Sequence, residues 1–119
     1  TVAYTGTHDT DTVRGWWNAA SAAERRFAAS YLPASEHDIH WGLVRAACNS
    51  VAKLAIFPLQ DVLGLGSEHR MNIPGTSTGN WGWRFDWGMV GPEPGRVLGL
   101  ISAASGRAPF SLLERALAA

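Results

Sequence analysis

Apolar positions along the chain form two short strand-like runs, separated by a long stretch with helical spacing. Residues 2–5 are mostly β-branched or aromatic and are followed by Gly6, which predicts a short strand ending just before His8 and Asp9. Residues 55–59 form a second apolar run without alternation, which is typical of a strand buried on both faces. The pattern therefore predicts two strands joined by a crossover far longer than a hairpin needs.

Two helices are predicted in the first part of this crossover. The first begins near Val13, and Thr10, Asp11 and Thr12 are all good caps for it. Asp11 is interpreted as a cap of this helix rather than as a second catalytic acid. A capping box formed by Ser21 and Glu24 opens the second helix, and Pro33 stops it.

A third predicted helix carries the clearest apolar stripe. Ser35 is its candidate cap, Glu36 and Asp38 lie in its first turn, and Lys53 lies near its last turn. Apolar residues recur on it at spacings of three to four, namely Ile39, Leu43, Ala47, Val51 and Leu54. This stripe is expected to lie on the sheet, and Trp41 on the same helix is expected to pack in the core.

The order strand, helices, strand predicts a parallel βαβ unit and hence an α/β fold. Two parallel strands do not make a stable sheet alone, so we expect residues 1–119 to be an incomplete domain that belongs to a longer chain. A strand that begins at the first residues agrees with this expectation. Residues 96–104 and 110–118 are predicted to form two closing helices.

Composition and charge narrow the possible partners. Hydrophobic residues make up 46% of the chain and charged residues 17%, which is an ordinary globular balance. Ten basic and ten acidic residues cancel without a basic block, so we expect no nucleic-acid partner. No apolar run approaches the ~18 residues of a membrane span, so no membrane partner is expected. The single cysteine, Cys48, suits a reducing compartment and predicts a cytoplasmic location.

Polar pairs follow both predicted strands. His8 and Asp9 come after the first strand, and Gln60 and Asp61 come after the second. In parallel α/β folds the carboxyl ends of the strands face the ligand crevice. An imidazole and a carboxylate at such a place can hydrogen-bond sugar hydroxyls, and the carboxylate can stabilise a developing positive charge. Ordinary turns and helix caps are the alternative interpretation of the same residues.

A glycine-rich segment further along the chain holds Asn80, Trp81, Trp83 and Arg84. Aromatic faces stack on the apolar faces of pyranose rings, while the amide and the guanidinium supply hydrogen-bond donors. The sequence alone leaves open whether these tryptophans bind a sugar or seal the end of a core.

Two further patterns are insufficient for a cofactor or a metal. His37 and His40 are three residues apart on one predicted helix, but no third ligand accompanies them. The pair Gly64 and Gly66 lacks the third glycine and the lysine of phosphate-binding loops. We therefore expect no metal and no cofactor, and we interpret Ser67 as the cap of a short helix after this loop.

Taken together, four motifs in this order resemble glycoside hydrolase family 77, the amylomaltases or disproportionating enzymes. The motifs are Tyr4–Thr12 with Arg14–Trp17, Pro58–Glu68, Arg70–Asn72 with Pro74–Gly75, and Gly79–Trp81 with Trp83–Arg84. The resemblance implies a (β/α)₈ TIM barrel in which this chain supplies about strands seven and eight, their helices and the closing segment. One departure is Thr10, which stands where the family has Asn.

The resemblance also implies a retaining 4-alpha-glucanotransferase, in which an aspartate nucleophile and a glutamate acid/base belong to an upstream part of the barrel. Asp9 matches the third catalytic carboxylate, which stabilises the transition state, and His8 matches a histidine that binds the same sugar. Asn80 and its neighbour Trp81 match positions near the substrate cleft, and Gln60 and Asp61 are further candidates for substrate binding. The implied partners are an α-1,4-glucan and the missing N-terminal part of the same barrel.

Two alternatives stay open at this stage. An α-amylase-clan hydrolase shares a His-Asp pair at the same strand end, and its products would distinguish it. A stand-alone glucan-binding module would use Trp81, Trp83 and Trp87.

Overall fold

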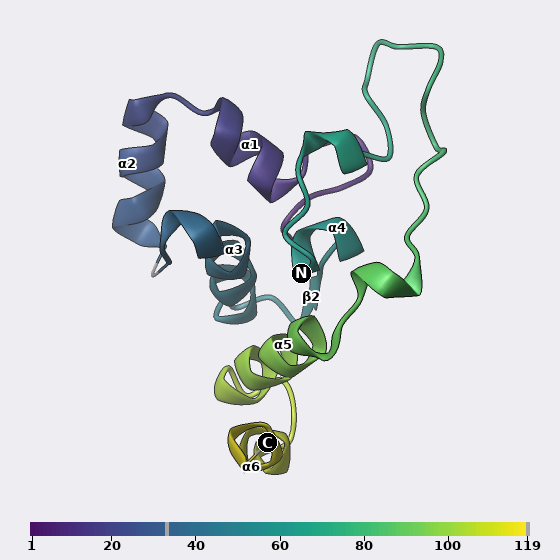
Figure 1. Ribbon diagram of the computed structural model, residues 1–119. Coiled ribbons are helices and arrows are strands. Elements are labelled where there is room, and N and C mark those ends of the chain that lie inside the picture. Colours follow the sequence, from purple (N-terminus) through teal and green to yellow (C-terminus); the bar gives the residue numbers. More distant parts are fainter. Residues whose placement is uncertain (33, 119) are drawn as a thin grey trace.

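The computed structural model describes residues 1–32 and 34–118, so the helix stop predicted at Pro33 lies outside the described residues. Figure 1 shows the arrangement of the elements. In chain order they are β1 (Val2–Tyr4), α1 (Val13–Ala19), α2 (Ala22–Tyr31), η1 (Glu36–Asp38), α3 (Ile39–Cys48), β2 (Leu54–Ile56), α4 (Leu59–Val62), η2 (Ser67–His69), η3 (Trp87–Met89), α5 (Pro92–Ala104) and α6 (Phe110–Ala118).

The two strands pair in parallel, with Val2 opposite Leu54, which confirms the predicted βαβ unit. The second strand ends before the predicted limit of residues 55–59, because Pro58 has no N–H for a sheet ladder and leads into α4. Burial on both faces is wrong for this strand in the described chain, since Leu54 and Ile56 are 55% and 47% exposed. Side chains alternate across a strand, and Ala55, which points to the other face, is less exposed than its two neighbours.

The cap of α1 is Thr12, one of the three predicted candidates, and not Asp11. Thr12 accepts the hydrogen bond from the Gly15 N–H, whereas the Asp11 carboxylate accepts from the Thr12 N–H and from the Ser67 hydroxyl, each at 2.7 Å. Ser67 is therefore not the cap of η2, which has Gly66 at that position and no side-chain cap. A Cβ on Gly15 would overlap both members of the Asp11–Ser67 pair, so this close contact requires glycine.

The capping box of α2 is confirmed. The Ser21 hydroxyl accepts from the Glu24 N–H, and the Glu24 carboxylate accepts from the Ser21 N–H at 2.7 Å. These bonds to the charged form lower the pKa of Glu24. Ser and Glu three residues apart satisfy N–H groups that have no partner within the helix. Because both residues lie in one turn, the sequence of that turn is enough to predict the cap.

The third helix is shorter than predicted. It ends at Cys48, so Lys53 lies beyond its last turn, and Ser35 forms no side-chain cap bond. The predicted stripe is only partly right: Ile39 is 1% exposed, whereas Val51 is fully exposed beyond the helix.

Two clusters of buried side chains hold α3 against the other helices. Val13, Trp17, Leu32 and Ile39 form the first, between α1, α2 and α3. The second joins α3 to α5 and contains Val44, Cys48 and Ile101, with partly buried Trp41 packed against it. This confirms the core position expected for Trp41. The burial that excludes water from Cys48 also raises the pKa of its thiol.

Both closing helices are present, as α5 and α6. The first starts earlier than residue 96 because Pro92 suits the first turn of a helix, where its missing N–H costs nothing. In Figure 1 these two helices lie at the end of the molecule opposite the long loop of residues 70–86.

Arg107, in the turn after α5, holds the segment that leads into β2. Its guanidinium donates hydrogen bonds to four backbone carbonyls, with distances of 2.7 Å to Cys48, 3.2 Å to Ser50, 2.8 Å to Ala52 and 3.4 Å to Lys53. A planar group with five N–H donors can serve several acceptors at once.

His40 lies on α3 directly under the turn at Gly64, which has a φ of +67°. A Cβ at that glycine would come within 2.9 Å of the His40 ring. Burial, and to a lesser extent the charge of Arg14, lowers the pKa of His40 below its usual 6.5. The neighbouring His37 is exposed, and among the described residues no three His, Cys, Asp or Glu side chains are grouped to hold a metal.

Replacing Arg107 by Met is expected to lower the free energy of unfolding by about 2–3 kcal/mol, because carbonyls of the turn before β2 lose a charged donor. Urea unfolding followed by tryptophan fluorescence measures this loss. Arg96→Met is the control, since the partner of Arg96 among the described residues is exposed Glu93 on the same helix. Equal midpoints for the two variants would contradict the assigned role.

The lowered pKa of His40 predicts a pH effect on stability. Because the folded state resists protonation of this ring, the unfolded state binds the proton more readily, and stability is lost as the pH falls through about 6.5. His40→Gln should make the midpoint of urea unfolding depend less on pH between about pH 5 and pH 7. His37→Gln is the matched control, and an unchanged slope in His40→Gln would refute the assignment.

Candidate functional site

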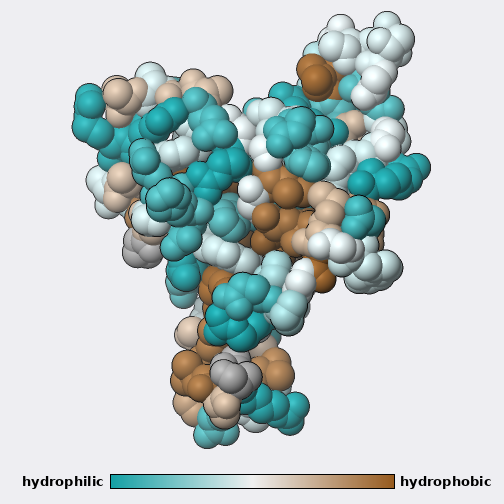
Figure 2. Space-filling view, viewed as in Figure 1, coloured by the Kyte–Doolittle hydropathy of each residue, from teal (hydrophilic) through white to brown (hydrophobic). Residues whose placement is uncertain are grey.

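A pocket of about 470 Å³ opens at the carboxyl ends of β1 and β2. Its walls come from β1 and the loop after it, from the end of β2 with α4, and from the loop that follows η2. Figure 2 shows an apolar area in the middle of the molecule, over the region where Figure 1 draws β2 and α4. The parallel pairing therefore brings both predicted polar pairs to one edge of the sheet, as the sequence indicated.

His8 and Asp9 lie side by side on the loop after β1. The Asp9 carboxylate contacts His8 Nε2 at 3.2 Å and accepts a 2.7 Å hydrogen bond from the Asn72 amide. The two side chains are about half exposed, and Arg70 donates to the Asp9 carbonyl at 3.2 Å. His8 lines the pocket, and its ring packs against Trp81 with centroids 5.0 Å apart. Asp9 lies next to His8 beyond the residues that line the pocket.

Asp61 is buried, with 2% of its surface exposed. One carboxylate oxygen accepts from the Thr5 hydroxyl at 2.7 Å, and the other accepts from the Val13 N–H at 2.8 Å. Asp61 does line the pocket, yet each of its oxygens already has a protein donor. Its substrate-binding role stays a prediction. The two hydrogen bonds by which it joins the end of β1 to the start of α1 are observed.

Gln60 also borders the pocket and is 9% exposed. Its side-chain amide donates to the His69 carbonyl at 3.2 Å, and the His69 ring accepts from the Trp83 indole N–H at 2.9 Å. Trp83 is thus tied into the structure by its polar edge. Sugar binding and sealing of the core both stay predictions for this tryptophan, whose ring packs edge-on against His69.

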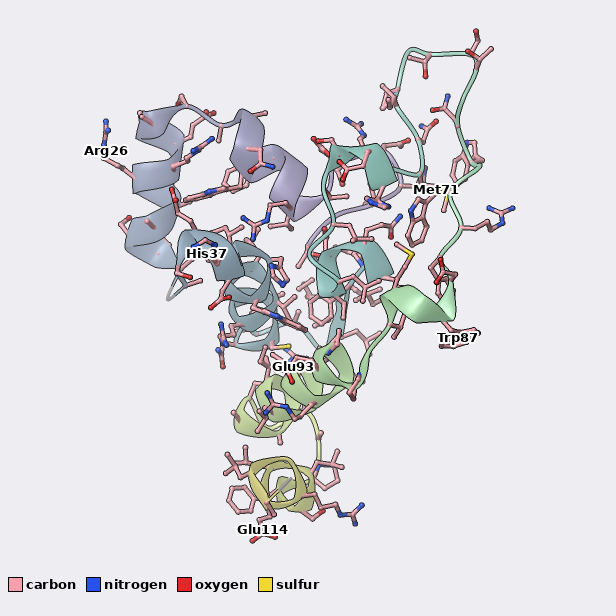
Figure 3. All side chains as sticks on the ribbon, viewed as in Figure 1. Arg26, His37, Met71, Trp87, Glu93 and Glu114 are labelled. Carbon is pink, nitrogen blue, oxygen red and sulfur yellow. The ribbon has the colours of Figure 1, made fainter. Side chains whose placement is uncertain are left out.

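Asn80 and Trp81 differ in their positions although they are neighbours. The Asn80 amide is used within its own loop, since it accepts from the Ile73 N–H at 2.9 Å and donates to the Thr76 hydroxyl at 2.9 Å. Asn80 is not among the residues that line the pocket. Trp81 is 56% exposed and lines it, with a φ of 61° that is unusual for a large side chain. The backbone N–H of Trp81 donates a 2.7 Å hydrogen bond to the carbonyl of Met71, which is labelled in Figure 3. This bond stabilises the unusual backbone conformation of Trp81.

Two contacts of the site were not predicted from spacing. Asn72 and Arg70 hold Asp9, but they are 63 and 61 residues away in the sequence, and only their membership of a motif singled them out. Thr10 accepts from the Thr7 N–H at 2.9 Å and donates to the Thr7 carbonyl at 3.0 Å. Its hydroxyl therefore closes the turn that carries His8 and Asp9.

Comparison with known proteins gives consistent results. The model of glycoside hydrolase family 77, described as 4-alpha-glucanotransferase, matches residues 1–89. The 4-alpha-glucanotransferase of a Synechocystis strain is 56% identical over 85 residues, which cover 71% of this chain and 17% of that protein. The 4-alpha-glucanotransferase of Thermus thermophilus is 46% identical over 112 residues, which cover 89% of this chain and 22% of that protein.

A solved structure, the amylomaltase from Streptococcus agalactiae in complex with acarbose, superposes with a TM-score of 0.83 at 30% identity. The match covers 91% of this chain and 22% of that one, so the chain spans about a fifth of the length of the proteins it matches. Because the family model covers most of the chain and the structural match covers nearly all of it, the chain belongs to glycoside hydrolase family 77, the 4-alpha-glucanotransferases.

Proposed function

We propose that this chain is part of a 4-alpha-glucanotransferase in which Asp9 is the carboxylate that stabilises the transition state. The observation that carries the proposal is the pair His8–Asp9, half exposed at the carboxyl end of a parallel strand and beside a pocket bordered by Trp81. The amylomaltase that resembles this chain was solved with acarbose, which supports a glucan substrate here. Carbohydrate metabolism is the corresponding process.

The remaining catalytic carboxylates are assigned to polypeptide outside these 119 residues. The chain would supply about strands seven and eight of a (β/α)₈ barrel, with their helices and the closing segment. Two features support this: the chain spans 22% of the matched amylomaltase, and the sheet has two strands among the described residues. Exposed Tyr4, Leu54 and Ile56 leave an apolar face that the missing N-terminal part of the barrel would cover.

The proposed reaction is a retaining double displacement. In the first step the aspartate nucleophile forms a bond to C1 of the donor sugar while the glycosidic bond breaks, and the glutamate gives its proton to the leaving oxygen. In the second step the 4-hydroxyl of an acceptor glucan gives its proton to the glutamate and attacks C1, which releases the aspartate. No cofactor takes part in either step.

Asp9 and His8 act on the sugar at the cleavage point. The Asp9 carboxylate would accept hydrogen bonds from hydroxyls of this sugar and stabilise the positive charge that develops at its C1. The His8 imidazole would bind the same sugar. Trp81 would offer a stacking face at the pocket rim. Gln60 and Asn80 would be further substrate contacts, although their side-chain amides also bond to the protein. Asp61, the other predicted contact, has a protein donor on each carboxylate oxygen.

An α-amylase-clan hydrolase is the alternative enzyme, and its products would be shortened chains without longer ones. A glucan-binding module built on three tryptophans fits the contacts less well. The Trp83 indole is bonded to His69, and Trp87 lies at the outer edge of the molecule, as Figure 3 shows.

The proposed location is the cytoplasm, on the ground of the single buried cysteine. Among the helices described, none has the length and apolar character needed to cross a bilayer. A related plant enzyme, from Arabidopsis thaliana, is named as chloroplastic/amyloplastic, and fractionation of the source cells tests the location directly.

The isolated 119 residues are expected to show no transferase activity, because the nucleophile and the acid/base lie elsewhere. Incubation with maltotriose and measurement of released glucose checks this. The full-length enzyme is the positive control and should yield glucose together with longer oligosaccharides. Glucose formed by the isolated chain would overturn the assignment of the missing carboxylates.

Asp9→Asn in the full-length enzyme should lower kcat for maltotriose disproportionation by at least roughly 10²-fold, because the transition state loses a nearby negative charge. Glu114→Gln is the control, since Glu114 is an exposed carboxylate on α6 at the far end of the molecule in Figure 3. Wild-type kcat in Asp9→Asn would refute the role of Asp9.

A further inference from the structure

We propose that Asp61 is a positioning residue, which fixes both ends of the loop that carries His8 and Asp9 instead of contacting the glucan. The inference rests on the proposed function, in which Asp9 acts on the sugar. Thr5 follows the last residue of β1, and Val13 is the first residue of α1, so the two donors to Asp61 mark where the loop begins and ends.

Asp61 comes from α4, 56 residues from Thr5 and 48 residues from Val13. Its bonds therefore join the segment after β2 to the loop after β1, across the edge of the sheet. The carboxylate is 2% exposed and accepts one bond on each oxygen, at 2.7 Å and 2.8 Å. A buried charged group is tolerated only with such partners, and bonds to an ionised acceptor are among the stronger ones.

Between these anchors, the loop has contacts of its own that keep its shape. The Thr10 hydroxyl bonds to both backbone groups of Thr7, and a Cβ on Gly6 would come within 2.7 Å of that hydroxyl. On the outer side, Asn72 holds the Asp9 carboxylate at 2.7 Å. The loop is thus a small unit that Asn72 and Ser67 hold along its length, and Asp61 holds both of its ends.

Because Asp61 sets the position of the loop, it would affect catalysis through the placement of His8 and Asp9. Displacement of a catalytic group by about 1 Å can lower a rate about 10²-fold without removing any contact to the substrate. Loss of the Asp61 anchor should therefore lower kcat more than it raises KM. A residue that itself binds the sugar would show the opposite pattern, with its charge or hydrogen-bonding groups acting mainly on KM.

Substitution by asparagine separates the two roles. In Asp61→Asn the side-chain oxygen can still accept from the Val13 N–H, while the amide can donate to the Thr5 hydroxyl, which is able to accept as well as donate. The anchor keeps both bonds although the charge is gone. Thr5→Val removes one bond with nearly the same side-chain volume, and Thr5→Ser restores the hydroxyl.

The test uses the full-length enzyme with maltotriose, and it measures kcat, KM and amide hydrogen exchange across residues 6–12. Thr5→Val is expected to lower kcat roughly tenfold with KM within about twofold, and Asp61→Ala to lower kcat about 10²-fold. Thr5→Ser and Asp61→Asn should stay within about threefold of wild type. Faster exchange in residues 6–12 should accompany Thr5→Val while the melting temperature changes little.

Two results would overturn the inference. One is wild-type kcat and unchanged exchange in Thr5→Val, which does not depend on whether Asp61→Ala folds. The other is a KM raised more than tenfold in Asp61→Asn with normal exchange, which would make Asp61 a substrate contact. An active Asp9→Asn enzyme would instead refute the proposed function, while the exchange measurement would still report on the Asp61 anchor.

Discussion

The parallel pairing of β1 and β2 is the constraint on which the rest of the structure depends. Because the strands run in the same direction, their carboxyl ends meet at one edge of the sheet, and residues more than 50 positions apart become neighbours there. The long crossover that parallel pairing requires is filled by α1, α2 and α3, and two buried clusters hold these helices in place. Arg107 then fixes the turn from which β2 starts, so the register of the sheet is coupled to the closing helices.

The site is held by polar side chains more than by the strands themselves. Each strand has three residues, and the loop after β1 gains its position from Asp61, Ser67 and Asn72, which all follow β2 in the chain. Hydrogen bonds to carboxylates are directional and short, so they fix a loop more closely than apolar contacts of the same number would. The segment after β2 therefore supplies residues that hold the loop as well as residues that line the pocket.

The parts of the fold that could be predicted from sequence are those set by local chemistry. Ser21 and Glu24 satisfy each other's backbone within one turn, and the apolar runs and the long crossover imply parallel strands whatever the surroundings are. The parts that could not be predicted depend on partners distant in sequence. Of the candidate caps, Thr12 holds the cap position, and the Asp11 carboxylate accepts from Ser67 instead. The burial of Asp61 depends on Thr5 and Val13, which lie 56 and 48 residues away. The spacing of residues within one segment does not predict contacts with residues that are distant in the sequence.

The exposure of Asp9 is a second reason to expect that these 119 residues show no transferase activity by themselves. A carboxylate stabilises positive charge strongly only where water is excluded, and the Asp9 side chain is 53% exposed. The sheet has apolar side chains on its uncovered face, with Tyr4 at 54% and Ile56 at 47% exposure next to the pocket. Under the proposed function, the rest of the proposed barrel would cover that face and exclude water from the pocket. Folding of the whole domain and the stabilisation of positive charge by Asp9 would then be coupled through one surface.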